Sequence, residues 1–244
     1  MVRIFISVAR IALAVIVTVI LSSCRTDIRG ITGSGHVTTQ TRNIQGDFHS
    51  IDAEGGLDIV IEQSDERSVT VKADDNLHKH IETTVDNGVL HIRTDKNQFV
   101  NVSAKEIIVK MPKIRSIEAG SGVTVRSANL INTNKLELDS SSGSSIKIDV
   151  EADVVISETS SGSHNTLTGK ALNLDISSSS GSQNDASRLV ANDVHAQASS
   201  GSSIRVNPIL SLDSEASSGA SIQYRKTPNR LIKDTSSGGS VSEF

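Results

Sequence analysis

The sequence predicts an all-β protein, whose main part is a right-handed, single-stranded parallel β-helix (a β-solenoid) with coils of about 19–20 residues. Three observations predict this fold. Short β-branched segments alternate between apolar and polar residues, and no amphipathic helix is evident apart from one turn over 74–81. A Ser-Ser-Gly element recurs at a nearly constant spacing. Residues at odd distances from each glycine are mostly apolar or small, so they share one face of an extended strand.

Seven glycines mark the repeat, with gaps of 21, 19, 19, 20, 18 and 19 residues. They are Gly122, Gly143, Gly162, Gly181, Gly201, Gly219 and Gly238. A linker has no reason to keep such a period, whereas the coils of a solenoid stack equivalent residues in columns about 4.8 Å apart. We therefore expect a tight corner at each element, where small residues fit a narrow cross-section, serine hydroxyls bond along the column and glycine relieves backbone strain.

Within each repeat, leucine or valine stands seven residues before most of these glycines, and valine or isoleucine stands three residues after most of them. Asn165 and Asn184 interrupt the second column, where we expect an asparagine ladder or a left-handed turn. Each coil should contribute about three short strands. If the first half continues the same helix, the chain forms roughly eleven coils.

The first half is less regular but is also predicted to be β-structure. Strands are expected over 48–53, 57–61, 69–71, 89–92 and 107–109, because these segments are β-branched and mostly alternating. Turn signals such as Asp86-Asn87-Gly88 separate them.

The amino terminus predicts export. Arg3 and Arg10 precede an apolar run over 11–21, which is too short to span a bilayer but has the length of the apolar region of a signal peptide. The run ends in Leu21-Ser22-Ser23-Cys24, which resembles the lipobox of bacterial lipoproteins. The resemblance implies cleavage before Cys24, the only cysteine, and acylation of its thiol and of the new amino terminus. The alternatives are an ordinary signal peptide with a chance cysteine, or an uncleaved anchor helix.

These features divide the chain into three parts. We expect a lipoprotein signal peptide over 1–23, a lipid-anchored tether over 24–45 and a β-helix domain over 46–244. Removal of the signal peptide leaves 22 basic and 28 acidic side chains, a net charge of −6, which disfavours nucleic acid as a partner. There is no tryptophan, and a sugar-stacking platform usually draws on more aromatic area than this chain offers.

The same residues resemble a known family, the head GIN domain of autotransporter-type adhesins, which is common in lipoproteins of Bacteroidetes-like bacteria. The resemblance spans nearly the whole mature chain. It is carried by the segments Arg42-Asn43-Ile44, Phe48-His49-Ser50-Ile51, Gly56-Leu57-Asp58-Ile59-Val60-Ile61, Asn76-Leu77, Ile81-Glu82-Thr83, Gly88-Val89-Leu90-His91-Ile92, Met111-Pro112-Lys113-Ile114, Gly120-Ser121-Gly122, Ile222-Gln223-Tyr224 and Pro228. It implies a right-handed β-helix without an established catalytic site. This chain departs from the family in having Ser-Ser-Gly where Gly-Ser-Gly is usual.

Two clusters of polar residues have the composition of a chemical site. Asp149, Glu151 and Asp153 form the densest acidic run, but the matching stretches of adjacent coils do not extend it, so we interpret it as a solvated edge rather than a catalytic or calcium site. His78-Lys79-His80 would place two imidazoles on one face of a strand, with His91 as a third metal ligand, yet exposed polar residues are the favoured interpretation. No phosphate loop or nucleophile elbow is present.

The function expected from the sequence is that of a lipid-anchored outer-membrane protein of the cell envelope, on the periplasmic or the surface-exposed side. It would bind the membrane through Cys24, and its rigid β-helix would serve as a non-enzymatic adhesion, binding or structural module for a protein, glycan or cell-wall ligand, without a cofactor. The alternatives are a carbohydrate-active β-helix enzyme of the polysaccharide lyase or hydrolase type, and an envelope-stress accessory protein. A groove with converging carboxylates and a basic residue would favour the enzyme. The sequence leaves the oligomeric state open.

Overall fold

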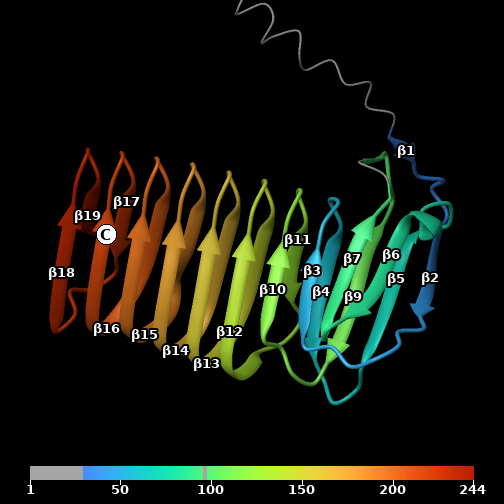
Figure 1. Cartoon of the computed structure of the whole chain (residues 1–244), viewed down its shortest axis with the longest axis horizontal. Coiled ribbons are helices and arrows are strands. Elements are labelled where there is room, and N and C mark those ends of the chain that lie inside the picture. The colour runs from blue at the N-terminus through green and yellow to red at the C-terminus, as the bar shows by residue number, and fades with distance from the viewer. Residues whose placement is uncertain (1–29, 96–97) are drawn as a thin grey trace, which may run out of the picture. The chain divides into compact units, whose positions relative to one another are not determined.

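The computed structural model describes residues 30–95 and 98–244, and strands dominate this part of the chain. From Ser116 onward the chain forms a stack of parallel coils in which each coil is hydrogen-bonded to the next, and the coils wind in the right-handed sense (Figure 1). The predicted all-β fold with a parallel β-helix is therefore confirmed. Within the described residues, no helix combines the length and the apolar character needed to cross a membrane.

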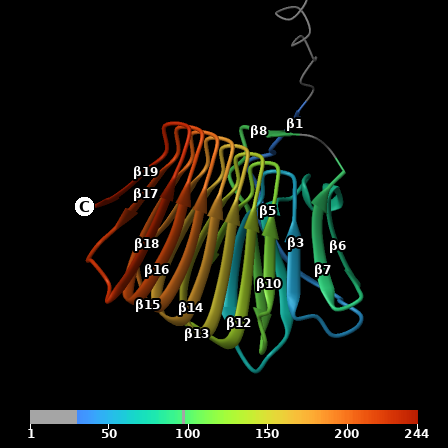
Figure 2. The same ribbon diagram turned by 60° about the vertical axis from the view of Figure 1, so that its left-hand side comes forward.

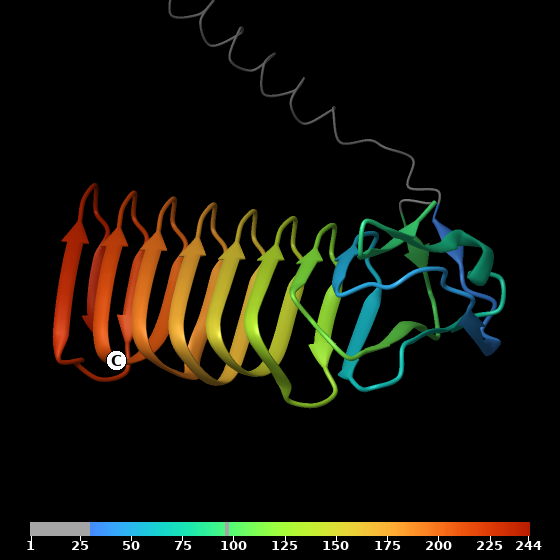
Figure 3. The same cartoon turned by 60° about the horizontal axis from the view of Figure 1, so that its bottom comes forward.

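The regular region of the stack begins at Ser116. Its strands are β10 (Ser116–Ala119), β11 (Thr124–Ser127), β12 (Ile131–Ser140), β13 (Ser145–Thr159), β14 (His164–Ser178), β15 (Gln183–Ala198), β16 (Ser203–Ala216), β17 (Ser221–Tyr224), β18 (Arg230–Thr235) and β19 (Ser240–Glu243). A tight turn closes one end of each coil and a rounded bend closes the other (Figures 2 and 3). We call the segment before each tight turn the first flank and the segment after it the second flank. The expected three strands per coil are wrong, because one strand such as β13 runs along the second flank, around the bend and along the first flank of the next coil.

The inward-facing columns match the predicted odd offsets. In β13 the buried side chains are Ile146, Ile148 and Val150 before the bend, and Val155, Ser157 and Thr159 after it. The buried positions change from even to odd numbers between 150 and 155, where the strand rounds the bend. Irregular repeat lengths are absorbed away from the tight turns, by register shifts between Thr166 and Thr168 in the pairing of β14 with β15 and between Asp185 and Val190 in that of β15 with β16.

The tight turns explain the Ser-Gly pair. In the turn Ser141–Ser144, φ is 53° at Ser142 and 71° at Gly143, and the Ser144 N–H donates to the Ser141 carbonyl at 3.1 Å. Two successive positive φ values are typical of a type I′ turn, which favours glycine at the second position. All seven repeat glycines share this conformation, each after a serine with positive φ. A Cβ on Gly143 would meet no atom within 4 Å, so its glycine relieves backbone strain, as expected, but fills no narrow space.

The narrow cross-section lies one residue further along, at the serines that follow the glycines. Ser144, Ser163, Ser182 and Ser202 are all buried. Each donates its hydroxyl to a carbonyl oxygen of the preceding coil, over 2.7–2.9 Å. The expectation that serine hydroxyls bond along the column is therefore confirmed for these positions.

Asn165 and Asn184 are neighbours in one buried column, but they do not form an asparagine ladder. Both carboxamides instead bond to Ser157, since the Nδ2 groups of Asn165 and of Asn184 each donate to its Oγ at 3.0 Å. Ser140 Oγ also donates to Asn165 Oδ1 at 2.7 Å. Neither asparagine has a positive φ, so the alternative of a left-handed turn is wrong. Shared hydroxyl groups satisfy both amides within the core.

The first region, 31–111, does not continue the winding. Its elements are β1 (Ile31–Thr32), β2 (Val37–Arg42), β3 (Ser50–Ala53), β4 (Asp58–Gln63), β5 (Ser68–Asp74), the 3₁₀-helix η1 (His78–His80), β6 (Ile81–Asp86), β7 (Val89–Thr94), β8 (Phe99–Val100) and β9 (Lys105–Met111). β3 and β4 form a coil that pairs with β10 and β11 on one side, and with β7 and β9 on the other. The coil that comes first in the sequence is therefore second in the stack. The expectation that the first half continues the helix to give roughly eleven coils is wrong.

Antiparallel strands close this end of the stack. β5 pairs with β9, β2 pairs with β5, and β6 pairs with β7, all antiparallel. Because β1 and β2 lie within 24–45, residues 31–42 belong to the fold rather than to the expected tether. β2 is almost entirely exposed, which explains its polar composition: an edge strand is held mainly by its backbone hydrogen bonds. The carboxylate of Asp74 fixes this end by accepting the N–H groups of Gly35, Ser103 and Ala104, each at 3.1 Å.

Candidate functional site

The outward face of the first flank carries a row of carboxylates, which we call the acidic column. The carboxylates lie in one line of register partners that crosses the strands from β3 to β18. The line is interrupted by Ser177 of β14 and Gln197 of β15, which have no charge. The carboxylates are Asp52, Glu118, Asp139, Glu158, Glu215 and Asp234. Adjacent strands of a sheet lie about 4.8 Å apart, so the first four side chains place like charges next to one another.

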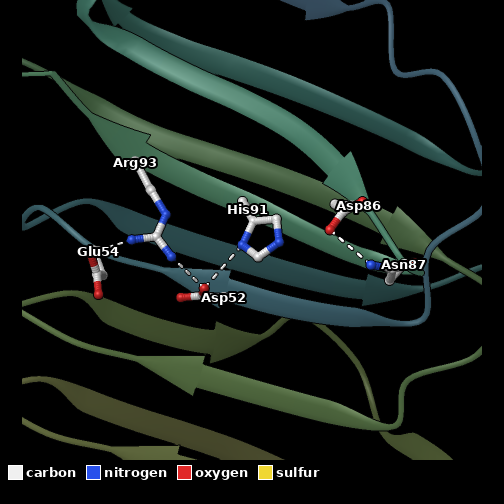
Figure 4. A network of polar contacts seen from close by, with 6 residues as sticks. All are labelled: Asp52, Glu54, Asp86, Asn87, His91 and Arg93. Carbon is white, nitrogen blue, oxygen red and sulfur yellow. Dashed lines mark hydrogen bonds and ion pairs between the residues drawn. The ribbon is translucent and has the colours of Figure 1, made fainter.

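Among the described residues, basic side chains pair only with the first member of this column, Asp52. Figure 4 shows Arg93 of β7 between two carboxylates, with Nη2 at 2.6 Å from Asp52 and Nη1 at 2.6 Å from Glu54. His91, the register partner of Asp52, holds the same carboxylate through Nδ1 at 3.0 Å. Asp52 is thus shared by two basic groups, and its neighbour Glu118 has no ion-pair partner among the described residues.

The electrostatics of Glu118 follow from this arrangement. Partial burial raises the pKa of Glu118 above its ordinary value, the negative charges of Asp52 and Asp139 raise it further, and His91 partly opposes them. Burial also raises the pKa of Asp139. The middle of the column is therefore a place where the fold holds carboxylates against their mutual repulsion, and where a cationic group would be attracted.

A shallow groove of about 390 Å³ follows the acidic column on the side of the tight turns. Asp139, Glu158 and Glu215 line it together with a row of turn residues. That row consists of Ser160, Ser179, Ser199 and Ser217. No basic side chain lines the groove among the residues that the structure describes, so it lacks the combination of converging carboxylates and a basic residue that an enzyme of the lyase type needs.

The acidic run proposed from the sequence lies elsewhere. Asp149, Glu151 and Asp153 are exposed on β13 at the rounded bend, away from the groove. In the next coil Thr168 stands beside Asp149 and Lys170 beside Glu151, as the repeat predicts. The predicted partners in the coil after that, Arg188 and Val190, are also in register. The interpretation as a solvated edge fits this exposed position.

The histidine cluster is not formed. His78-Lys79-His80 is a 3₁₀ turn rather than a strand, so its two imidazoles do not share a strand face. His78 is buried and its Nε2 lies 2.9 Å from Thr38 Oγ1, whereas His80 Nδ1 lies 2.9 Å from Asp95. His91 faces Asp52. Within the described ranges, no three residues of the metal-binding types come together.

Most of the acidic column can be predicted from the sequence. Counting four residues back from a repeat glycine gives Glu118, Asp139, Glu158, Glu215 and Asp234, and an even offset places them on the outer face. Asp52 could not be found in this way, because its neighbours come from strands that are distant in sequence. Cys24, the predicted lipid-attachment residue, lies outside the described residues, as do 1–23.

Comparison with known proteins identifies relatives of the fold. A family model described as "Putative auto-transporter adhesin, head GIN domain" matches residues 47–228. A search of curated protein sequences finds no match.

Solved structures share the whole architecture at low sequence identity. A protein from Bacteroides fragilis titled a putative adhesin has a TM-score of 0.82 at 21% identity, and the match covers 88% of this chain and 100% of that one. A putative lipid binding protein from Parabacteroides distasonis has a TM-score of 0.73 at 17% identity, with the same coverage. A putative adhesin from Parabacteroides merdae has a TM-score of 0.70 at 15% identity, with 88% and 99% covered. At these identities the structures support the fold alone.

Proposed function

Because this chain belongs to the head GIN domain family of auto-transporter adhesins, we propose that it is a lipid-anchored, non-enzymatic adhesion module of the cell envelope. The observation that carries the proposal is the acidic column with its serine-lined groove, a continuous polar surface along the first flank. The names of the relatives from Bacteroides fragilis and Parabacteroides merdae, both titled putative adhesins, support the same role.

The partner should carry basic groups on its surface. Three carboxylates of the column open into the groove, and a cationic partner would relieve their repulsion. The rigid stack keeps these charges at fixed spacing, so binding orders few side chains and loses little conformational entropy. A protein, a glycan or the cell wall can meet these requirements only where it presents cationic groups.

An attachment assay tests this proposal. Cells that display the full chain are applied to immobilised glycans and to immobilised matrix and envelope proteins, and bound cells are counted. On any surface that retains the cells, the triple change Asp139→Asn, Glu158→Gln, Glu215→Gln should lower attachment by about tenfold, because it removes the charges that line the groove.

The rounded bend provides the matched control. The change Asp149→Asn, Glu151→Gln, Asp153→Asn removes an equal number of negative charges from outside the groove. Cells carrying it should attach as before. Equal losses in the two triple variants would show a net-charge effect and contradict a site in the column. Attachment no greater than that of cells lacking the chain, on every surface, would contradict adhesion itself.

The lipid anchor has its own test. Replacement of Cys24 by alanine removes the thiol that the lipobox resemblance assigns to acylation, so the protein should move from the membrane to the soluble fraction. Ser22→Ala keeps the thiol of Cys24 and is the matched control, which should remain in the membrane. Unchanged membrane association of the Cys24→Ala protein would refute the anchor.

A glycan-cleaving enzyme is the second candidate, and Glu118 is the observation that favours it. The pKa of Glu118 is raised, whereas the neighbouring carboxylate Asp52 is held by His91 and Arg93, and glycosidases use two carboxyl groups whose surroundings differ in this way. Release of reducing ends from polysaccharides by the full chain, lost in Glu118→Gln, would establish this activity. No release from any acidic or neutral polysaccharide would remove this candidate.

A further inference from the structure

A second hollow, of about 510 Å³, has the opposite charge. It lies where the ends of β4 and β9 meet the segment before β10 and the start of β12. Three basic residues line it, Lys113, Arg115 and Lys135, and no acidic residue does so within the described part of the chain. In a protein with more acidic than basic side chains, such a cluster is a local reversal of charge. We call it the basic hollow.

Two of its cations are unpaired. Lys113 and Arg115 are exposed, and their side chains form no hydrogen bond or ion pair with the described residues, although the main chain of Arg115 bonds to His49 and Glu137. Lys135 differs, because its Nζ lies 2.5 Å from Glu137 Oε1. Two free cations on the wall of one hollow repel each other unless an anion lies between them, so the site is complementary to an oxyanion.

The floor of the basic hollow is rigid. Gln63 Nε2 donates to the carbonyls of Pro112 at 3.1 Å and of Asn132 at 2.9 Å, and Gln63 Oε1 accepts the Asn132 N–H at 2.7 Å. The Gln63 main chain is held in turn by the Asn129 carboxamide, at 3.0 and 2.9 Å. These bonds tie β4 to the start of β12, so the hollow exists before any ligand arrives, and binding does not have to order its floor.

We propose that the basic hollow binds a carboxylate-bearing saccharide. Lys113 and Arg115 would hold the carboxylate, and Asn132 and Asn134, which line the same hollow, have carboxamides that can bond sugar hydroxyls. Pro112 is the apolar member of the lining, which suits a polar sugar better than the apolar side chains of a peptide. The proposal rests on the proposed role as a binding module and names one class of ligand for it, at a site separate from the acidic column.

Calorimetric titration of the full chain in detergent tests it. The probes are tetragalacturonate, its fully methyl-esterified form and sodium phosphate, all measured at the same pH and at two salt concentrations. Tetragalacturonate should bind at least about tenfold more tightly than the ester and than phosphate, because only it offers both carboxylates and sugar hydroxyls. Its affinity should fall with added salt.

Paired variants locate the site. Lys113→Gln with Arg115→Gln should weaken tetragalacturonate binding by about tenfold. The control, Lys147→Gln with Arg188→Gln, removes one lysine and one arginine charge from exposed positions outside the hollow. This variant should bind tetragalacturonate as the unchanged protein does. All four residues are exposed, so circular dichroism should show both variants folded.

Several results would overturn the proposal. Equal affinity for the ester would show that charge is not recognised, and equal affinity for phosphate would show a free-anion site without sugar recognition. Equal losses in the two paired variants would place binding elsewhere. Each of these outcomes leaves the attachment assay of the acidic column untouched, so failure here and failure of the adhesion proposal are distinguishable.

Discussion

The two regions of the fold are built by different rules. In the regular region, 116–243, one conformational unit recurs, and most residues pair with an equivalent residue one coil away. In the first region, 31–111, parallel and antiparallel pairings alternate, and the coil of β3 and β4 lies between strands that follow it in sequence. The regular region therefore repeats most of its contacts from coil to coil, whereas the first region depends on particular contacts made once.

The largest expected effect concerns a glycine of the regular region that is not part of the repeat. Gly169 of β14 has a φ of 116°, and a Cβ there would clash with the Val150 carbonyl. Gly169→Ala should therefore destabilise the protein by about 3 kcal/mol. Urea unfolding followed by circular dichroism measures this change.

A turn glycine is the control for that experiment. Gly143→Ala should cost only about 1 kcal/mol, because its φ of 71° is accessible to other residues at some strain and its Cβ would meet open space. Equal costs for the two substitutions would mean that the carbonyl of Val150 moves aside, and that the repeat turns are as constrained as the interior of the strand.

In the first region, the local stability of the end strands should depend on one side chain, Asp74. Burial raises the pKa of Asp74, but the hydrogen bonds from Gly35, Ser103 and Ala104 outweigh it and lower the pKa below the ordinary 3.8. Asp74→Asn replaces an acceptor-only group with one that also donates, and should open β2 and the segment before β9. Hydrogen exchange should then rise in 37–42 and stay unchanged in 183–198.

The pH dependence of this contact has a definite sign. Because the pKa is lower in the folded protein, the stabilisation is complete above the ordinary value of 3.8 and is lost as the pH falls through the folded value. The exchange of 37–42 should therefore be flat from neutral pH to about pH 4 and rise below it, relative to 183–198. Simultaneous opening of both segments would contradict the independence of the two regions.

A smaller effect is expected in the polar part of the regular core. Ser157→Ala leaves the carboxamides of Asn165 and Asn184 without their shared hydroxyl, which should cost about 1–3 kcal/mol. Ser202→Ala removes a buried hydroxyl with one carbonyl partner and should cost less, since alanine already occupies the equivalent position at Ala220. Thermal unfolding of both proteins measures the difference, and equal costs would show that the two hydroxyls are equivalent.

The difference between the regions also explains what the sequence could predict. The period of the repeat glycines specifies the coil, the buried columns and the serine hydroxyl bonds, since each depends on residues at fixed offsets. It also specifies most of the acidic column, through the offset of four. The pairing of β3 with both β7 and β10 has no periodic signature. The single helical turn expected over 74–81 is present, as the 3₁₀-helix at 78–80.

Two further errors have local physical causes. The composition of the corners predicts a narrow cross-section at the Ser-Gly pair itself, whereas it lies at the buried serine that follows each glycine, because composition alone does not distinguish a small residue required by space from one required by positive φ. The polar composition of 24–45 predicts a tether, but 31–42 contains two strands. An edge strand such as β2 can be polar and still be ordered, because its backbone pairs with β5 on one side.

A substitution that improves the turn should give a modest gain. Ser161 has a φ of 51°, and asparagine adopts this left-handed conformation more readily than serine does. Ser161→Asn should therefore stabilise the protein by about 0.5 kcal/mol, measured by thermal unfolding. Ser145→Asn, on an extended residue of β13, should not stabilise it, and a gain there would mean that the effect is not conformational.

The smallest expected change concerns the acidic column, and its sign is opposite to that of Asp74. The pKa of Glu118 is raised by burial and by Asp52 and Asp139, so the folded protein disfavours its ionised form. At neutral pH, Glu118→Gln should stabilise the protein by less than about 0.5 kcal/mol, because the side chain is largely exposed to solvent. The gain should disappear below the ordinary pKa of 4.5, where glutamate is protonated in both states. Glu151→Gln, at the rounded bend beside Lys170, should give no gain at either pH. If the gain of Glu118→Gln persisted in acid, its cause would be packing rather than repulsion within the column.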